Sequence, residues 1–144
     1  MTVWLLDANV LIALIDRQHV EHDVATRWFL AQRDDGWATC PLTENAVLRI
    51  VGGAGYRNSP GSPSAVMPAL IDLCSHGGHV FWADNLSLRD QLAFFHDRLL
   101  TSAQLTDTYL LALAKHHGGA LATFDRRLVS DAVEDGMHYV RMVR

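Results

Sequence analysis

The fold of this chain follows from the stretch Val3-Trp4-Leu5-Leu6-Asp7-Ala8-Asn9-Val10-Leu11-Ile12, in which an apolar run meets a carboxylate. Residues 3–6 are apolar without alternation, which is typical of a short strand buried on both faces. Residues 8–16 have the apolar spacing of a helix. The stretch therefore predicts a buried strand that passes into a helix at Asp7, with the Asp7 side chain at the carboxyl end of the strand.

Three more carboxylates occupy similar junctions between apolar segments. They are Glu44 after residues 37–42, Asp107 before residues 109–114, and Asp125 after residues 120–124. Open α/β sheets bind their ligands beyond the carboxyl ends of the strands, so side chains at those ends lie near one another. Four acids at such points predict one acidic metal site.

Glu44 and Asp107 lie on helix faces that the spacing predicts to be apolar. Glu44 is aligned with residues 47, 48 and 51, and Asp107 is aligned with residues 110, 111 and 114. A carboxylate on an inward face is unfavourable unless its charge is compensated, and a divalent cation can compensate it. The alternative is that each is a first-turn acid, stabilised by the helix dipole and by backbone N–H groups.

Composition points to one globular domain over residues 1–144. The apolar fraction of 49% is enough for a core of its own, and the formal net charge of −4 excludes a surface that binds polyanions everywhere. Lys115 is the single lysine, which removes most mechanisms that need a catalytic lysine or a P-loop. Any nucleic acid would be bound locally, beside the metal site.

Two cysteines and the N-terminal stretch indicate the compartment. Cys40 and Cys74 stand among apolar neighbours without Cys-x-x-Cys spacing, as small buried side chains do in a reduced compartment. Asp7 and Asp16 interrupt the apolar N-terminal stretch, and no basic segment precedes it. We therefore expect a cytoplasmic protein with neither a signal peptide nor a membrane span.

Strand and helix patterns alternate along the chain, which predicts an α/β fold. We expect a central, mostly parallel sheet of about five short strands, flanked by helices in three layers. Strands are predicted over residues 3–6, 37–42, 79–82, 120–124 and 138–143. Helices are predicted over residues 8–16, 20–35, 44–52, 63–76, 103–117 and 126–132, and within 86–99. Residues 52–61 are too rich in Gly, Pro and Ser for a regular element, so we expect a long loop there.

The residue types at these four junctions indicate the chemistry. Clustered carboxylates with no matching His or Cys suit Mg²⁺ or Mn²⁺ better than zinc. Such ions activate water and stabilise the charge on a phosphodiester under attack, so phosphodiester hydrolysis is the predicted reaction. Without the cation, the four like charges would raise one another's pKa values.

The acids lie within four segments that also carry a resemblance to a known family. The segments are Leu6-Asp7-Ala8-Asn9-Val10-Leu11, Thr43-Glu44-Asn45, Leu105-Thr106-Asp107 and Ala122-Thr123-Phe124-Asp125. In this order and at this spacing, the chain resembles PIN-domain ribonucleases, especially the VapC toxins of bacterial toxin–antitoxin systems. The resemblance implies that the catalytic, metal-binding acids are Asp7, Glu44, Asp107 and Asp125. It implies supporting roles for Asn9 and Thr123.

The resemblance also implies a substrate and partners. The expected activity is that of a Mg²⁺-dependent endoribonuclease, with Mn²⁺ as a substitute, acting on a structured RNA such as tRNA. As the toxin of a toxin–antitoxin pair, the protein would inhibit translation and growth until a VapB-type antitoxin binds near the active site. A homodimer is expected, and a hetero-oligomer with the antitoxin.

Four residues are candidates for RNA contacts. Arg126 and Arg127 adjoin Asp125 and are placed to reach a phosphate, with exposed arginines at a helix start as the simpler interpretation. Tyr56 and Arg57, in the predicted loop, combine a stacking ring with a phosphate-binding fork, with ordinary loop chemistry as the alternative.

Two other functions compete with the nuclease. A haloacid-dehalogenase-like phosphatase also has an aspartate after its first strand, but here Asp7-Ala8-Asn9-Val10-Leu11 lacks the second acid of that family's motif. The other competitor is a PIN-like module that binds RNA or a protein without cutting. The presence of all four acids argues against a site that has lost its activity.

Overall fold

Five short strands form one parallel sheet in the computed structural model, which describes residues 1–144. They are β1 (Trp4–Leu6), β2 (Trp37–Thr39), β3 (His79–Phe81), β4 (Ala120–Thr123) and β5 (Val140–Met142). The strand order is β3-β2-β1-β4-β5, and every neighbouring pair is parallel. The predicted α/β fold is confirmed, and β1 lies at the centre of the sheet.

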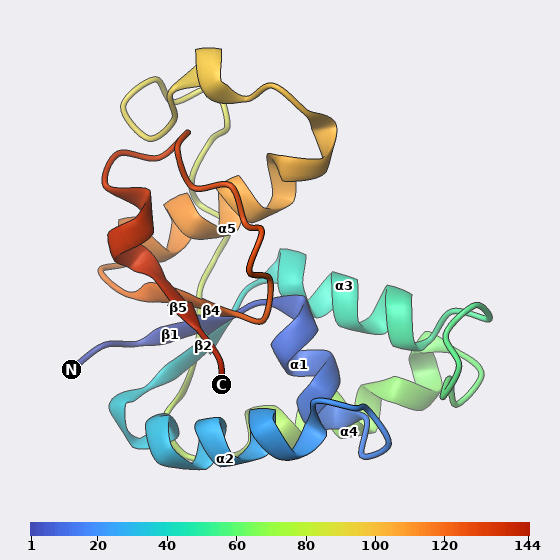
Figure 1. Ribbon diagram of the computed structural model, residues 1–144. Helices are drawn as coiled ribbons and strands as arrows, with labels where there is room; N and C mark the ends of the chain where they lie inside the picture. The colour runs from blue at the N-terminus through green and yellow to red at the C-terminus, as the bar shows by residue number, and fades with distance from the viewer.

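Helices cover both faces of this sheet, so the molecule has three layers (Figure 1). The five α-helices are α1 (Ala8–Ile15), α2 (His22–Gln32), α3 (Pro41–Val51), α4 (Pro63–Cys74) and α5 (Leu105–His116). The first four pack together on one face, and α5 lies against β1 and β4 on the other. None of these helices combines the length and the apolar character that a membrane span requires.

The two faces of β1 contribute to two separate cores, which explains why its sequence does not alternate. Trp4 and Leu6 point into the core beneath α1 and α2, whereas Leu5 points into the core beneath α5. Leu5 and Leu6 have no exposed surface. Burial on both faces is the normal condition of a central strand in a parallel sheet. Burying each such side chain stabilises the fold by roughly 1.5–3 kcal/mol.

The helix predicted within residues 86–99 is absent. The segment forms turns and one short 3₁₀ helix at His96–Arg98, and it lies above α5 in Figure 1. Ser87 Oγ and Asp90 Oδ1 each accept a hydrogen bond from the backbone N–H two residues further on, at 3.1 and 2.9 Å. Such local bonds compete with helical pairing, so the apolar spacing of this segment was a misleading signal.

The helix predicted over residues 126–132 is also wrong. Asp125 Oδ1 accepts a 2.9 Å hydrogen bond from Arg127 N, and the chain turns there instead of coiling. Further 3₁₀ turns extend α2 at Arg33–Asp35 and precede α5 and β5, at Ser102–Gln104 and Gly136–Tyr139. The predicted loop at residues 52–61 is confirmed as turns and bends between α3 and α4.

Candidate active site

Asp7 joins the end of β1 to the start of α1. Its extended backbone (φ −61°, ψ 154°) makes it the N-cap, and its Oδ1 accepts a 2.7 Å hydrogen bond from Ala8 N. Its Oδ2 accepts a 2.8 Å hydrogen bond from Thr123 Oγ1 at the end of β4. The side chain is only 6% exposed, so one buried carboxylate links the carboxyl ends of two neighbouring strands.

Thr123 and Asn9 complete a polar network around Asp7. Asn9 Nδ2 donates to Thr123 Oγ1 at 3.2 Å, and Asn9 Oδ1 accepts from Phe124 N at 3.2 Å. Thr123 Oγ1 also accepts from Asp125 N at 3.0 Å. A threonine hydroxyl has one proton, and here Asp7 receives it. The structure thus gathers both residues that the sequence predicted to support the acids.

Asp107 and Asp125 bring two more carboxylates to the same edge of the sheet. Asp107 lies in the first turn of α5, Asp125 lies just after β4, and both side chains are half-buried. Burial raises the pKa of Asp107 to about 6, and the negative charges of Asp7 and Asp125 add to the rise. Burial also raises the pKa of Asp7, against the lowering effect of the hydrogen bonds from Thr123 and Ala8, and the charge of Asp125 adds to the rise.

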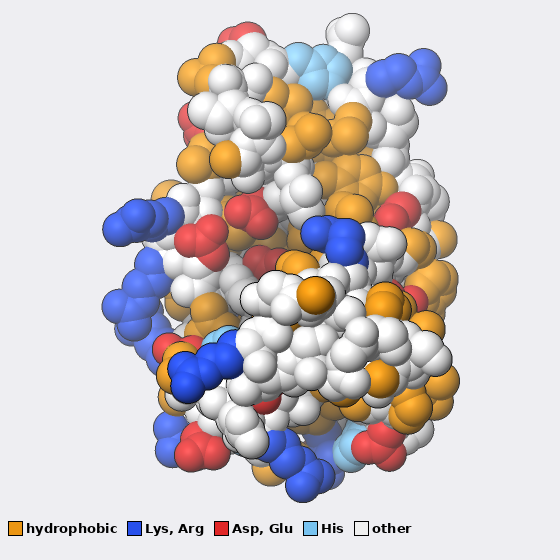
Figure 2. Space-filling model, turned by 90° about the vertical axis from the view of Figure 1, so that its right-hand side faces the viewer, with side chains coloured by type: hydrophobic (Ala, Val, Ile, Leu, Met, Phe, Trp, Pro, Cys, Tyr) orange, Lys and Arg blue, Asp and Glu red, His pale blue; other side chains and the backbone are white.

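Asp7, Asp107 and Asp125, which we call the aspartate cluster, form a set of oxygen donors with a concentrated negative charge. Figure 2 shows acidic side chains gathered around a hollow at mid-height on one side of the molecule, with basic side chains nearby. No three His, Cys, Asp or Glu side chains are close enough to hold a metal ion as they stand. Carboxylate oxygens without His or Cys are ligands that suit Mg²⁺, and Asp7, Asp107 and Asp125 would be the residues to hold it.

Glu44 lies in the first turn of α3 and contacts the end of β2. Its Oε2 accepts a 2.7 Å hydrogen bond from Thr39 Oγ1, at the end of β2. Thr39 Oγ1 is also 2.8 Å from Nε2 of His79, the first residue of β3. Burial raises the pKa of Cys74 and lowers that of His79, and in both cases the negative charge of Glu44 acts in the upward direction. The negative charge of Glu44 therefore acts on His79 in β3 and on Cys74 in α4.

The sequence spacing missed Thr39 and His79. Both belong to short strands, where neither an acidic junction nor helical periodicity marks them. One weak signal was present: Thr39 is a polar residue at the last position of a strand, and it proves to be fully buried. A buried hydroxyl needs a partner, and the carboxylate of Glu44 five positions later supplies one.

The four candidate RNA-binding residues separate into two pairs. Arg126 and Arg127 are exposed and directly follow Asp125, so they lie beside the aspartate cluster. Tyr56 and Arg57 lie in the loop between α3 and α4, which meets the opposite end of α1. A helix of 8 residues is about 12 Å long. The structure therefore separates the loop pair from the aspartate cluster by the length of α1.

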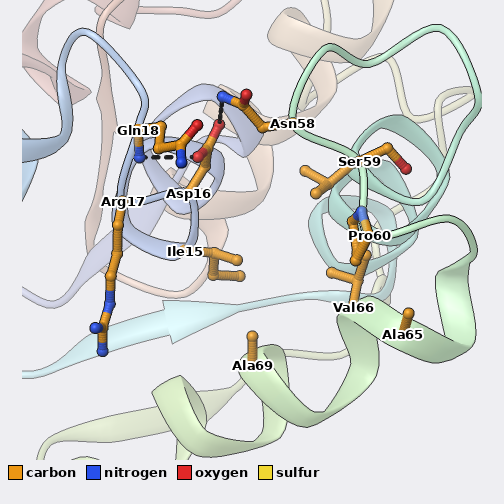
Figure 3. A pocket seen from close by; sticks show the side chains of 11 residues that line it. Ile15, Asp16, Arg17, Gln18, Asn58, Ser59, Pro60, Ala65, Val66 and Ala69 are labelled. Carbon is orange, nitrogen blue, oxygen red and sulfur yellow. Dashed lines mark hydrogen bonds between the residues drawn. The ribbon is translucent and has the colours of Figure 1, made fainter.

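Tyr56 fastens its loop to the C-terminal end of α1. Its hydroxyl donates to Asp16 Oδ2, and burial together with Asp16 raises the pKa of Tyr56 to about 12. Asn58 Nδ2 and Gln18 N each donate to the same carboxylate at 3.0 Å (Figure 3). Burial raises the pKa of Asp16, but these hydrogen bonds outweigh burial and lower it.

A hollow of about 530 Å³ lies next to the Asp16 carboxylate, between the end of α1 and the start of α4 (Figure 3). Its lining mixes polar groups, such as Asn58 and Ser59, with apolar ones, such as Ile15 and Val66. None of the aspartate cluster lines it. Because Asp16 already accepts three hydrogen bonds, the hollow does not offer a free acid, and the candidate active site lies elsewhere.

The sheet and the aspartate cluster define a class of protein. It is a three-layer α/β protein with acids at the carboxyl edge of a parallel sheet, an arrangement suited to metal-dependent hydrolysis. The sequence model of the PIN domain matches residues 4–132, which include the whole aspartate cluster. The chain therefore belongs to the PIN-domain family.

Similar proteins place the chain among the VapC ribonucleases of that family. Ribonuclease VapC44 of Mycobacterium tuberculosis is 41% identical over 133 residues, 90% of each chain. Ribonuclease VapC39 of the same organism is 39% identical over 128 residues, 89% of this chain and 92% of its own. The crystal structure of M. tuberculosis VapC20, a toxin that cleaves the sarcin–ricin loop, covers 90% of this chain and 95% of its own with a TM-score of 0.61. Its 13% identity makes that likeness one of fold alone.

Proposed function

We propose that this protein is a Mg²⁺-dependent endoribonuclease whose metal site is built on Asp7, Asp107 and Asp125, with Glu44 as a fourth acid. One observation carries the proposal: burial and neighbouring negative charges raise the pKa of Asp107 to about 6. Carboxylates held together against their own repulsion are typical of a site that binds a cation. The curated relatives are named ribonucleases, which supports RNA as the class of substrate.

The chain's own residues have distinct roles in this proposal. A bound Mg²⁺ supplies charge stabilisation to the phosphodiester and acidifies water. Thr123 holds Asp7 through one hydrogen bond to Oδ2, and each oxygen of Asp7 keeps a lone pair for the cation. Asn9 holds Thr123 in turn, so that its hydroxyl proton faces Asp7. Asp107 is ionised, and so able to bind a cation, above a pH of about 6.

Arg126 and Arg127 are proposed to hold the RNA next to the scissile bond. Both are exposed immediately after Asp125, and a guanidinium can bind two phosphate oxygens at once. The net charge of −4 leaves the rest of the surface unattractive to RNA, so binding is local. The proposed substrate is a structured RNA such as tRNA. A contact from Tyr56 and Arg57 would require an RNA that also reaches the far end of α1.

The proposal extends to the biological setting. As a VapC-type toxin consisting of one PIN domain over residues 1–144, the protein would cut RNA needed for translation and so arrest growth. A VapB-type antitoxin would bind near the active site and inhibit it. The protein would form a homodimer, and a hetero-oligomer with its antitoxin. The family to which the chain belongs supports these assignments.

The two competing functions have less support. A haloacid-dehalogenase-like phosphatase needs a second acid where Asn9 stands, and the Asn9 side chain is bound to Thr123 and to Phe124 N. A binding module without catalysis has no use for a cluster in which burial and neighbouring negative charges raise the pKa values of Asp7 and Asp107. In the proposed nuclease, Asn9 positions Thr123 and the aspartate cluster binds the metal.

A cleavage experiment tests the proposal. Purified, antitoxin-free protein is incubated with total bacterial RNA in Mg²⁺, in Mn²⁺ and in excess EDTA, and the new RNA ends are sequenced. We expect discrete cuts that need the metal and that Asp107→Asn abolishes. The matched control is Asp34→Asn, because Asp34 is exposed in the turn just before β2, at the amino edge of the sheet. Absence of cuts under every condition, or cuts that persist in Asp107→Asn, would contradict the proposal.

A further inference from the structure

A second hollow, also of about 530 Å³, lies between the start of α2 and the ends of β4 and β5. Its apolar lining includes Val24, Phe124 and Met142, and two further lining residues, Arg126 and Arg144, carry guanidinium groups. We call it the arginine hollow. Its volume lies within the range of roughly 300–1,000 Å³ that is usual for sites that bind small molecules. The arginine hollow therefore has the size of a site for one unit of a polymer such as RNA.

The arginine hollow and the aspartate cluster share one wall, the segment from Thr123 to Arg126. Thr123 Oγ1 donates to Asp7, and the charge of Asp125 raises the pKa of Asp7, so these two residues act on the aspartate cluster. Phe124 and Arg126 line the hollow instead. The side chains alternate between the two sites, as they do along an extended chain. Because successive α-carbons are about 3.8 Å apart, an RNA strand cut at the cluster has its next nucleotide within reach of the hollow.

The end of β5 places Arg144 beside this shared wall. Val143 N donates a 2.9 Å hydrogen bond to Thr123 O, which continues the pairing of β5 with β4 beyond Met142. The Val143 side chain is buried, so the chain is fixed directly before Arg144. Arg126 and Arg144 are both exposed. Two guanidinium groups from neighbouring strand ends therefore meet at one hollow.

The lining combines the contacts that a single-stranded nucleotide makes. A guanidinium group binds two phosphate oxygens together, and an aromatic face stacks on a base. Phe124 is half-buried and packs against the core beneath α1 and α2, which fixes its ring. Glu21 is the one carboxylate side chain of the lining, and it can accept from N–H groups on the edge of a base. A ligand that offered negative charge alone would leave the apolar lining unused.

We propose that the arginine hollow binds the nucleotide next to the scissile bond, with Arg126 and Arg144 on its phosphate and the Phe124 ring against its base. This inference rests on the proposed function, because it takes RNA as the ligand and Asp125 as part of the metal site. It adds Arg144 and Phe124 to the residues that contact the substrate. A base must be unpaired and unstacked to reach a protein ring. The hollow therefore selects a single-stranded stretch of RNA at the cut.

RNA binding in EDTA tests the phosphate contacts without cleavage. The probe is a short fluorescent single-stranded RNA of mixed sequence, and its anisotropy is followed at several salt concentrations. Each phosphate contact contributes about 0.7 to the slope of log affinity against log salt concentration. Arg126→Gln and Arg144→Gln should each reduce this slope by about 0.7. Arg33→Gln is the matched control, because it removes the same charge just before β2, at the amino edge of the sheet, and should keep the wild-type slope.

The aromatic contact is tested with the same probe. Phe124→Leu keeps an apolar side chain but removes the stacking face, so affinity should fall by about tenfold while the salt slope stays unchanged. Phe124→Tyr keeps the ring and should bind as the wild type does. When the probe is annealed to its complement, the wild type and Phe124→Leu should bind it equally, because its bases are then stacked within the duplex.

Three results would overturn the inference. They are the absence of RNA binding in EDTA, salt slopes that neither arginine variant changes, and wild-type affinity of Phe124→Leu for the single-stranded probe. Oligoglutamate is the competing ligand. If it binds as tightly as RNA of equal charge and is weakened by the same variants, the hollow is a site for acidic peptides and the inference is wrong.

The inference and the proposed function can fail separately. A protein that shows this binding pattern among its variants but cuts no RNA in Mg²⁺ would retain the nucleotide site and lose the nuclease. A protein that cuts RNA in Mg²⁺ but whose variants bind the probe as the wild type does would retain the nuclease and lose the nucleotide site.

Discussion

Thr123 Oγ1 donates a 2.8 Å hydrogen bond to Asp7 Oδ2 across 116 positions of sequence. The bond joins the ends of β1 and β4, which are neighbours in the sheet. It lowers the pKa of a carboxylate whose burial raises it. Thr123 therefore acts on the charge of Asp7 as well as on its position.

The first prediction concerns this hydroxyl. Thr123→Val should raise the pKa of Asp7 further and reduce RNA cleavage at pH 7 by about tenfold or more, the size of effect found when groups supporting a metal ligand are removed. Thr123→Ser should retain most of the activity. Cleavage rates of both variants over a range of pH check this; equal rates for Thr123→Val and wild type would show that the hydroxyl is dispensable.

The second prediction is a pH profile. Burial and the charges of Asp7 and Asp125 raise the pKa of Asp107 to about 6, so this carboxyl takes up a proton as the pH falls through that value. A protonated carboxyl is a poor ligand, and Mn²⁺ affinity should fall steeply below about pH 6. Asp125→Asn removes one of the charges that raise this pKa, so the midpoint should move to lower pH. A Mn²⁺ titration at several pH values measures both midpoints.

The third prediction concerns stability without metal. The pKa of Asp107 is higher in the folded protein, at about 6, than its ordinary value of 3.8, so the folded state binds more protons. The negative charge of Asp107 does not destabilise the folded state below a pH of 3.8, its ordinary pKa, and its destabilising effect is fully present above about pH 6. Asp107→Asn should therefore raise the Tm of the metal-free protein at pH 7.5 and not at pH 4.

Addition of Mg²⁺ provides the complementary measurement for Asp107. The wild type should gain thermal stability from Mg²⁺, because a ligand of the folded state alone stabilises it. Asp107→Asn should gain much less, and Asp34→Asn should behave as the wild type. A metal-free Tm for Asp107→Asn below that of the wild type at pH 7.5 would contradict the charge argument.

The fourth prediction separates a structural role of Tyr56 from an RNA contact. Tyr56→Phe removes the hydrogen bond to Asp16 and should cost about 1 to 2 kcal/mol of unfolding free energy, with little change in the rate of RNA cleavage. Arg57→Ala, in the same loop, should leave stability unchanged because the Arg57 side chain is exposed. Chemical denaturation and cleavage assays decide between the roles: a stable Tyr56→Phe with weakened RNA binding would favour the ring as a stacking platform.

Much of the fold could be predicted from the sequence, because burial on both faces gives a strand a continuous apolar run. Residues 3–6 and 120–124 carry that signal, and β1 and β4 form there. The segment 86–99 carries a helical spacing that the structure does not use. Leu92 illustrates the reason: it is 96% exposed, and its backbone N–H is bound to the side chain of Asp90.

Part of the candidate site could also be predicted from the sequence. Asp7, Asp107 and Asp125 follow from the rule that parallel strands present their carboxyl ends at one edge. The direction in which Glu44 points does not follow from that rule. It depends on Thr39 and His79, which lie on strands whose pairing is known only from the three-dimensional structure.

The order of the chain has a consequence for synthesis. Chains are made from the N-terminus, and early segments can fold first. A growing chain that ends after α4 already contains Asp7 and Glu44, but it lacks Asp107, Thr123 and Asp125. The last part of a growing chain is inside the ribosome, so the aspartate cluster can assemble only after residues 107–125 have emerged from it.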